Sequence, residues 1–400
     1  MKQTFTIILS SLLALYIVEA YLTGHGYYKK SHDLQEKINT FKNKTGENYD
    51  TRPFFQAYYE LKKNANDLVP MIPMRESLEV DIKPYALSNG VSNSPTLFCN
   101  ESGKYIKYLS DKYGFNNPNN QWNQKSVGYL LIGDSFTHGM CVEEKYTIPG
   151  NLRKVTNQAV LNLGNSGTGP LAQYATLREY SPLVNEKRII WVYYEGNDLL
   201  NLDYELKNKT LVSYLIEQKY TQELSTKQKD IDVRYKNIIK NVIDKDQNQM
   251  EGLPSKMLPI QRFIKLVSLR IFIKNIYRPM KSQSLIDYNP NYEKYRDILK
   301  LVKTYTENNN VKLYFVYLPS YFRMATNRLE DKNLFGYQKV LDLTKSLEID
   351  TIDLNKEFLN SSYDLKTLYP LKGSGHLNHK GYYEVTRSIY GFIEKNETKN

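Results

Sequence analysis

Short apolar runs alternate with helical patterns over residues 123–205 and again over 290–396. Five runs have the length and the β-branched or aromatic content of buried strands: 129–132, 159–163, 188–194, 312–318 and 350–354. Helical patterns follow most of them, around 148–156, 171–180, 292–308, 335–347 and 380–395. This alternation predicts an α/β fold, a five-stranded parallel sheet covered on both faces in a flavodoxin-like, three-layer αβα arrangement. Chemistry is expected at the carboxyl ends of the strands.

A polar insertion, residues 206–289, separates the two parts of this domain. Its first half, 211–246, has a charged helical pattern typical of a solvated face. Its second half, 255–284, carries seven Lys and Arg residues and no acid, interleaved with Ile, Phe and Val. Two interpretations stay open: a basic amphipathic helix on a bilayer, or a helix packed on the domain with its cations in water.

The first 24 residues predict export. Residues 3–18 are uncharged and mostly apolar, and as a helix they would rise about 24 Å, slightly short of a bilayer core. Val18-Glu-Ala20 also fits cleavage of a signal peptide after Ala20. We favour a retained anchor, because Tyr21 and Leu22 extend the apolar stretch. The expected location is the cytoplasmic membrane, with the rest of the chain on its outer, periplasmic side; a buried helix of a cytosolic protein is the alternative.

The formal net charge of +11 suggests an anionic partner. Nucleic acid is not expected, because the cations are spread along the chain without an Arg-rich arm or a zinc knuckle. An acidic glycan or an anionic membrane surface fits better. Two cysteines and five histidines show no metal-ligand spacing, so neither a metal nor another cofactor is expected.

Four motifs follow or precede the predicted elements in order. Gly133-Asp134-Ser135 comes directly after the strand 129–132, where an open α/β sheet places its chemistry. The other three are Gly164-Asn-Ser-Gly-Thr-Gly169, Gly196-Asn-Asp198 and Gly375-His-Leu-Asn-His-Lys-Gly381. Each motif alone is common in turns, but all four in this order are improbable by chance.

The series resembles the SGNH (GDSL-type) hydrolase superfamily, whose four blocks supply Ser, Gly, Asn and His. The stretches 99–105 and 110–118 look like the lead-in found in exported, membrane-anchored members associated with surface polysaccharides. The resemblance to the hydrolase domain itself covers residues 126–205 and 290–394. It divides the chain into an anchor or signal peptide (1–24), a stalk and bracing region (25–122), the hydrolase domain in two parts (123–205 and 290–396) and the insertion (206–289).

The resemblance also implies the roles of individual residues. Ser135 would be the nucleophile and His376 its base; His376 is favoured over His379 because it precedes Asn378, which can cap the next helix. The oxyanion hole would comprise the backbone N–H groups of Ser135 and Gly167 and the side-chain amide of Asn197. Asp134 and Asp198 would support the loops that carry these groups.

One position departs from the family pattern. The family usually places an Asp three residues before the His, where this chain has Gly373. Either a backbone carbonyl near Gly373 or a remote acid such as Asp353 orients His376, or the site is weak and the protein binds glycan without turning it over. We favour a working site.

Cys99 and Cys141 could form a disulfide in an oxidising compartment. A closed loop of about 41 residues would stabilise the fold by up to about 4 kcal/mol in the entropic model. Because Cys141 lies six residues after Ser135, this bridge would brace the site against the N-terminal region.

Three functions follow. The first is a serine esterase or acyltransferase that removes or moves acetyl groups on a cell-surface polysaccharide. The second is an inactive glycan-binding or scaffolding subunit of polysaccharide assembly. The third is a lipase acting on membrane lipid, suggested by the basic stretch 255–284. The oligomeric state stays open.

Overall fold

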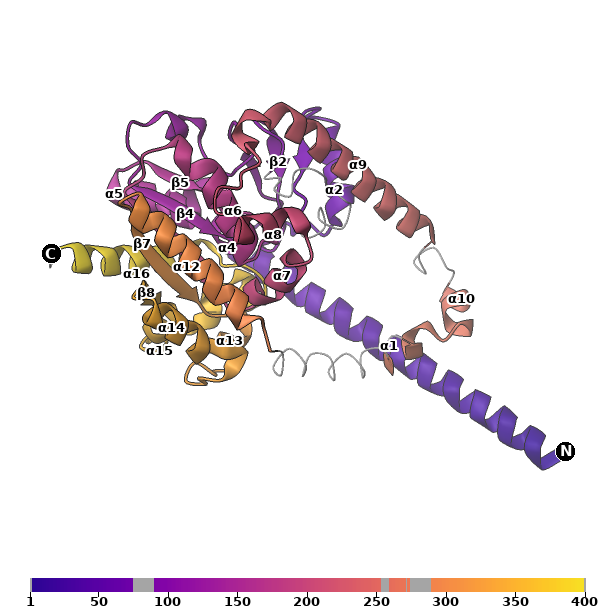
Figure 1. Ribbon diagram of the computed structural model, residues 1–400. Helices are drawn as coiled ribbons and strands as arrows, with labels where there is room; N and C mark the ends of the chain where they lie inside the picture. The colour runs from indigo at the N-terminus through magenta and orange to yellow at the C-terminus, as the bar shows by residue number, and fades with distance from the viewer. Residues whose placement is uncertain (1, 75–89, 253–258, 271, 274–288, 399–400) are drawn as a thin grey trace. The chain divides into compact units, whose positions relative to one another are not determined.

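The computed structural model describes residues 2–74, 90–252, 259–270, 272–273 and 289–398 (Figure 1). The chain divides into two compact units. One comprises Met1–Tyr49 and Lys240–Tyr288, and the other Asp50–Ile239 and Asn289–Asn400. The second unit contains the predicted hydrolase domain.

The second unit is built on a five-stranded, all-parallel sheet of order β5-β4-β6-β7-β8. Its strands are β4 (Tyr129–Gly133), β5 (Val160–Asn162), β6 (Arg188–Tyr194), β7 (Lys312–Leu318) and β8 (Asp350–Asp353). These are the five predicted strands, so the predicted α/β sheet is confirmed. The order places β4 in the interior, with β5 and β6 as its neighbours.

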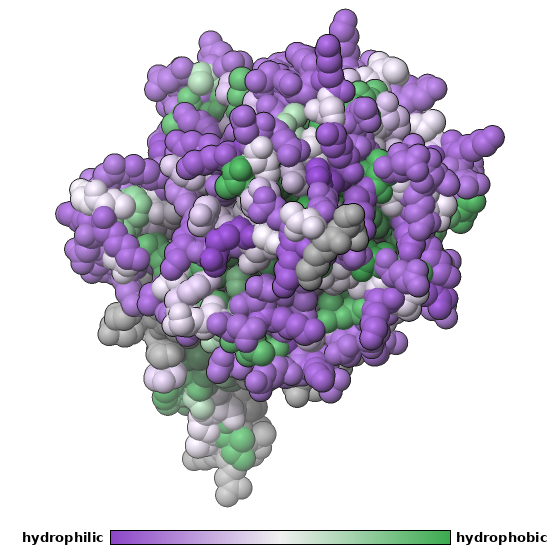
Figure 2. All heavy atoms as spheres, turned by 90° about the vertical axis from the view of Figure 1, so that its left-hand side faces the viewer, coloured by the Kyte–Doolittle hydropathy of each residue, from purple (hydrophilic) through white to green (hydrophobic). Residues whose placement is uncertain are grey.

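Two apolar cores separate the layers, one on each face of the sheet. Side chains alternate along a strand, so Leu130 and Ile132 belong to one core while Tyr129 and Leu131 belong to the other. The first core takes in α6 (Pro170–Tyr180) and α12 (Tyr292–Asn308), and the second takes in α5 (Ile148–Thr156) and α16 (His379–Glu397). Helices therefore cover both faces, as the alternating pattern predicts. On the face shown in Figure 2 the surface is mostly hydrophilic, with apolar side chains in small separate groups.

Local chemistry sets several helix boundaries. Asn378 accepts a hydrogen bond from the Gly381 N–H, so α16 begins at His379. Phe335 and Gly336 have left-handed φ angles of 51° and 69°, which delays the helix predicted from residue 335 to α14 (Tyr337–Ser346). Further α-helices are α2 (Phe54–Lys62), α4 (Ser135–His138), α7 (Asp198–Glu205), α8 (Lys209–Ile216), α9 (Gln228–Gly252), α13 (Tyr321–Ala325) and α15 (Leu354–Leu359). The 3₁₀ turns are η1 (Asn119–Asn123), η2 (Glu144–Tyr146), η3 (Ser181–Leu183), η4 (Leu224–Thr226), η5 (Leu334–Gly336), η6 (Leu365–Leu368) and η7 (Pro370–Lys372).

The bracing region has a small sheet of its own in the second unit. Strand β2 (Pro95–Leu97) pairs in parallel with β1 (Val69–Pro70) and antiparallel with β3 (Lys107–Leu109). A buried carboxylate, Asp111, accepts from Trp122 Nε1 at 2.7 Å and from Asn117 Nδ2 at 2.9 Å. Asn117 also donates to the carbonyl of Asn162 in β5. This region is therefore bonded directly to the edge of the main sheet.

The first unit contains α1 (Lys2–Thr45) and α10 (Pro259–Ile264). The helix α1 continues past residue 24 and ends at Thr45, in the first part of the region predicted as a stalk and brace. Among the described residues, no helix combines the length and the apolar character that crossing a bilayer requires. The helix predicted over 211–246 is interrupted, because α8 ends at Ile216 and α9 begins at Gln228. Much of the predicted basic segment, 255–258, 271 and 274–284, lies outside the described residues.

Candidate active site

Ser135 lies on a sharp turn at the carboxyl end of β4. At Gly133 φ is +155°, and a Cβ there would lie 2.1 Å from Thr137 Oγ1, so a residue with a side chain does not fit. Asp134 then accepts the Phe136 N–H at 2.9 Å and caps α4, whose first residue is Ser135. The local sequence therefore holds the Ser135 hydroxyl at the end of an interior strand.

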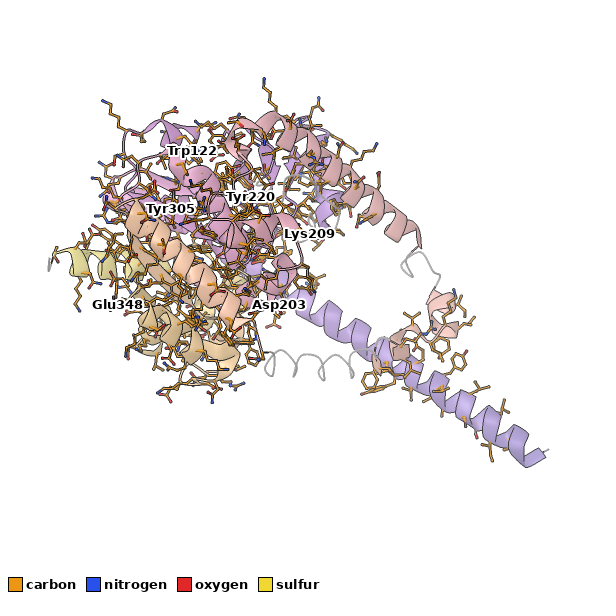
Figure 3. The ribbon with its side chains drawn as sticks, in the orientation of Figure 1. Trp122, Asp203, Lys209, Tyr220, Tyr305 and Glu348 are labelled. Carbon is orange, nitrogen blue, oxygen red and sulfur yellow. A yellow bond between two sulfur atoms is a disulfide. The ribbon has the colours of Figure 1, made fainter. Side chains whose placement is uncertain are left out.

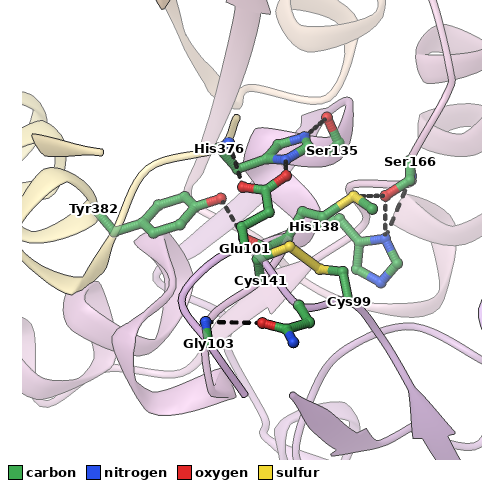
Figure 4. The surroundings of a disulfide bond; sticks show 11 residues. Cys99, Glu101, Gly103, Ser135, His138, Cys141, Ser166, His376 and Tyr382 are labelled. Carbon is green, nitrogen blue, oxygen red and sulfur yellow. Dashed lines mark hydrogen bonds and ion pairs between the residues drawn. A yellow bond between two sulfur atoms is a disulfide. The ribbon is translucent and has the colours of Figure 1, made fainter. Parts of the chain in front are cut away.

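His376 is brought to Ser135 from the other end of the predicted hydrolase domain. Its Nε2 lies 2.8 Å from Ser135 Oγ (Figure 4). Its ring packs on Phe136, with the ring centres 4.9 Å apart. Two residues later, Asn378 Nδ2 donates to the carbonyls of Thr367 and Tyr369, which fixes the turn before α16. The two residues predicted as nucleophile and base are thus within hydrogen-bonding distance.

A carboxylate that the sequence analysis did not identify, Glu101, holds the other side of His376. Glu101 Oε1 lies 2.9 Å from His376 Nδ1, and Oε2 accepts the backbone N–H of His376 at 2.6 Å. With the proton on Nδ1 donated to Glu101, Nε2 is left to accept the Ser135 proton. Ser135, His376 and Glu101 therefore form one chain of hydrogen bonds with the connectivity of a serine triad.

Neither acid substitute expected from the sequence fills this role. Asp353 accepts from the Tyr337 hydroxyl at 2.6 Å and caps α15, so its carboxylate has a structural task. No carbonyl near Gly373 is needed, because the Glu101 carboxylate occupies the Nδ1 side of the ring. The expected carbonyl and the choice of Asp353 were therefore wrong, whereas the expectation that a remote acid orients His376 is confirmed, with Glu101 as that acid.

Gly375 explains how an acid from a distant segment reaches this position. Its φ is +146°, and a Cβ there would lie only 2.5 Å from Glu101 Oε2. A residue with a side chain would push the carboxylate away from the His376 N–H. The glycine before His376 therefore leaves the space that Glu101 occupies.

A disulfide between Cys99 and Cys141 ties the Glu101 loop to the nucleophile turn. Asn100 closes the loop on its other side: its Oδ1 accepts the Gly103 N–H, and its Nδ2 donates to the Asp50 carbonyl, both at 2.8 Å. On the nucleophile side, the N–H of Met140 donates to the Ser135 carbonyl at 3.0 Å. Glu101 is therefore held by a covalent link two residues away and by a closed turn.

The predicted oxyanion-hole residues lie at the strands on either side of β4. Gly167, with φ of +81°, is in the loop after β5, and Asn197 precedes α7 in the loop after β6. Because β5 and β6 flank β4, both loops start from the same edge of the sheet as Ser135. Asn197 Oδ1 is buried and has no hydrogen-bond partner among the residues that the structure describes. The Asn197 side chain therefore does not stabilise the loop through a hydrogen bond to Oδ1.

Asp134 and Asp198 are buried and serve the backbone around the site. Burial raises the pKa of Asp134 to about 6, against the lowering effect of the Phe136 N–H. Asp198 accepts the Tyr194 N–H at 3.1 Å, and burial, followed by the charge of Asp134, raises the pKa of Asp198 well above its usual range. Both carboxyls shape the loops beside Ser135 and Asn197.

The other two histidines near the motifs lie outside the triad. His138 is buried, with Nδ1 3.1 Å from Ser166 Oγ and Nε2 3.1 Å from the Tyr108 hydroxyl, and burial lowers its pKa to about 3. His379 stacks on Tyr146 with ring centres 4.0 Å apart. Neither is the base that faces Ser135.

One group in the described part of the chain has ligand atoms close enough for a metal. Glu101, Cys141 and His376 bring an oxygen, a sulfur and a nitrogen within 4.8 Å of one another. The Cys141 sulfur is in the disulfide and cannot act as a thiolate ligand, and the two ring nitrogens face Glu101 and Ser135. The donor set therefore fits a triad better than a metal centre.

Comparisons with known proteins do not assign this chain to a family. No protein-family model matches this sequence, and no curated protein matches it. Among solved structures, the chain is similar to one described as a lipolytic protein of the G-D-S-L family from Desulfitobacterium hafniense DCB-2. The TM-score is 0.36 at 13% identity, covering 67% of this chain and 99% of that one. At this similarity, function has to be argued from the side chains of the chain itself.

Proposed function

We propose that this chain is an SGNH-type serine hydrolase or acyltransferase acting on ester bonds. The observation that carries the proposal is the hydrogen-bond chain from Ser135 Oγ through His376 to Glu101. A serine hydroxyl is a weak nucleophile until a neighbouring base can take its proton. A binding-only protein was considered because Gly373 occupies the position where the family has an Asp. Glu101 supplies the carboxylate that this Asp would provide.

The reaction follows from the positions of these groups. Ser135 Oγ attacks the acyl carbonyl while His376 Nε2 takes its proton, and Glu101 stabilises the imidazolium that results. Hydrogen bonds stabilise the negative charge on the carbonyl oxygen; the donors are the N–H groups of Ser135 and Gly167 and the side-chain amide of Asn197. His376 then returns the proton to the departing alcohol, which leaves an acyl group on Ser135. Water or a sugar hydroxyl, deprotonated by His376, removes that acyl group and restores the enzyme.

Acetyl groups on a cell-surface polysaccharide are the substrate we propose. The support is the predicted export, the net charge of +11 and the resemblance to polysaccharide-associated members of the superfamily. Hydrolysis and transfer share the acyl-enzyme and differ only in the acceptor.

The test combines labelling with substrate choice. The full chain in mild detergent is treated with a fluorophosphonate probe, and the labelled peptide is identified by mass spectrometry. We expect the label on Ser135, abolished by His376→Ala and retained by His379→Ala, a matched change three residues away. A label absent from Ser135, or indifferent to His376, would refute the serine mechanism.

Activity on p-nitrophenyl acetate, butyrate and palmitate then separates the substrate classes. We expect the acetyl ester to be the best of the three. A clear preference for palmitate would favour the lipase, and labelling without turnover of any ester would require acetylated glycans as substrates.

A further inference from the structure

The helix α1 exposes apolar side chains around its whole circumference. Described residues with large exposed areas include Ile7, Leu9, Leu12, Leu13, Ile17 and Tyr21, and Ile7 and Tyr21 are 65% and 68% exposed. At 100° per residue these positions are spread around the helix axis. Figure 3 shows side chains projecting from both sides of α1. A helix that is apolar on all sides is stable in apolar surroundings rather than in water.

Glu19 interrupts this apolar stretch, and its carboxylate accepts hydrogen bonds from a distant segment of the chain. It is 1% exposed, and its carboxylate accepts the backbone N–H groups of Ser268 at 2.8 Å and of Leu269 at 2.6 Å. These N–H groups belong to the first turn of a helical stretch that starts at residue 267 and have no partner within it. Glu19 therefore caps a helix from a distant part of the chain.

Further contacts hold this distant segment on the same side of α1. The Thr23 and Ser268 hydroxyls are 2.8 Å apart, and the Tyr16 hydroxyl donates to the Ile264 carbonyl at 3.1 Å. The rings of Tyr16 and Phe263 lie with their centres 5.4 Å apart. The described residues between 259 and 273 thus pack along residues 16–23 of α1, within one compact unit.

The packed segment presents both apolar and cationic side chains outward. Ile260, Ile264, Phe272 and Ile273 are exposed, as are the cations Lys265 and Arg270. No acidic residue occurs between positions 253 and 286 of the sequence. Cations beside exposed apolar side chains are typical of surfaces that bind anionic lipid.

We infer that α1 and the described residues 259–270 and 272–273 form one lipid-docking element, locked together by Glu19, that binds a bilayer containing anionic lipids. The apolar side chains of both segments face the acyl chains, and Lys265 and Arg270 face the anionic headgroups. Glu19 can sit beside the acyl chains because backbone N–H groups satisfy its carboxylate. A second copy of the chain would cover the apolar side chains but would bring the same cations against each other. The inference does not depend on the proposed reaction.

The test places a fluorescent reporter in the segment. Trp122 and Trp191 are buried in the other unit, so a Phe272→Trp variant of the full chain adds the one tryptophan expected to contact lipid. Vesicles of phosphatidylglycerol and brominated phosphatidylcholine should quench the emission of this reporter tryptophan and shift it to the blue. Adding Lys265→Glu and Arg270→Glu should weaken binding to these vesicles about 30-fold or more, the effect of losing two cations at an anionic surface.

Two controls distinguish lipid docking from an effect of net charge and from loss of the folded structure. Lys154→Glu with Lys345→Glu makes the same change in net charge at exposed positions of the other unit and should leave quenching unchanged. Glu19→Ala should reduce quenching of the reporter tryptophan by releasing the segment from α1, while hydrolysis of p-nitrophenyl acetate stays the same. Equal quenching in the two charge-reversed variants would overturn the inference. The inference would also be overturned if the reporter tryptophan were buried in a dimer in the absence of lipid, because this surface would then bind a second copy of the chain.

Discussion

Ser135 and Glu101 stand at the two ends of one hydrogen-bond chain, but different kinds of contact hold them. Ser135 is positioned by its own neighbours: Gly133 makes the turn, and Asp134 caps the helix that Ser135 begins. Glu101 is positioned by segments far along the chain, through the disulfide at Cys99 and the space left at Gly375.

The site is therefore robust at the nucleophile and vulnerable at the acid. The nucleophile turn follows directly from the end of a buried strand, so it forms wherever the sheet forms. The position of Glu101 depends on the packing of the bracing region against the sheet, on the Cys99–Cys141 disulfide and on the absence of a side chain at Gly375. Variants should therefore damage the two ends of the triad by different routes.

The largest effect is expected at the nucleophile. Ser135→Ala removes the attacking oxygen and should lower kcat/KM for p-nitrophenyl acetate by about 10⁴-fold or more. Ser126→Ala, at an exposed position before β4, should leave the rate unchanged. A Ser135→Ala variant that retains much of the activity would show that the reaction uses another group.

Glu101→Gln comes next and tests the acid directly. The amide cannot stabilise the imidazolium or enforce the same tautomer, so kcat should fall by about 10³- to 10⁴-fold. Asp353→Asn is the matched control, because Asp353 is the acid that sequence reasoning would choose; it should spare kcat, since an asparagine side-chain oxygen can still cap α15. The opposite pattern in the two variants would return the role to Asp353.

Asn197→Ala should have a smaller effect on the rate. Removing one oxyanion donor typically costs about 10²- to 10³-fold in kcat. Asn185→Ala, at an exposed position before β6, controls for loss of an amide. An unchanged kcat would mean that Ser135 and Gly167 alone stabilise the oxyanion.

Within the triad, breaking the disulfide should displace the acid and leave the nucleophile in place. Replacing Cys99 and Cys141 together by Ala loosens Glu101, and a misplacement of about 1 Å can cost about 100-fold, so a loss of kcat of about 10- to 100-fold is expected. The link spans 42 residues of sequence, so the free energy of unfolding should also fall, by up to about 4 kcal/mol. Dithiothreitol should slow the wild type in the same way and leave the double variant unaffected. Fluorophosphonate labelling of Ser135 should persist, though more slowly.

The smallest effect concerns stability near the nucleophile turn. Burial lowers the pKa of His138 to about 3, from 6.5 in the unfolded chain. Between these values the unfolded state binds more protons, so stability is fully present above pH 6.5 and is lost as the pH falls toward 3. His138→Gln should therefore show a smaller drop in the urea midpoint between about pH 7.5 and about pH 4.5 than the wild type. An equal drop in both proteins would contradict the lowered pKa.

The sheet and the local half of the site could be predicted from the amino-acid sequence. The five predicted runs became the five strands, because the interior strands of a parallel sheet that is covered on both faces need continuous apolar stretches. Ser135 and the helix that follows His376 were readable because turns and helix caps are encoded within a few residues. The boundaries of α1 and α14 were less accurate, because left-handed residues and helix continuation leave weak patterns.

The identity of the acid was decided by the tertiary structure. No carboxylate close to His376 in the sequence faces its ring, and Glu101 lies 275 positions away. One signal was present: Glu101 is two residues from Cys99, and a link from Cys99 to Cys141 carries that neighbourhood to Ser135. A hydrogen bond between distant segments depends on where their backbones meet, and no local pattern of side chains records that meeting.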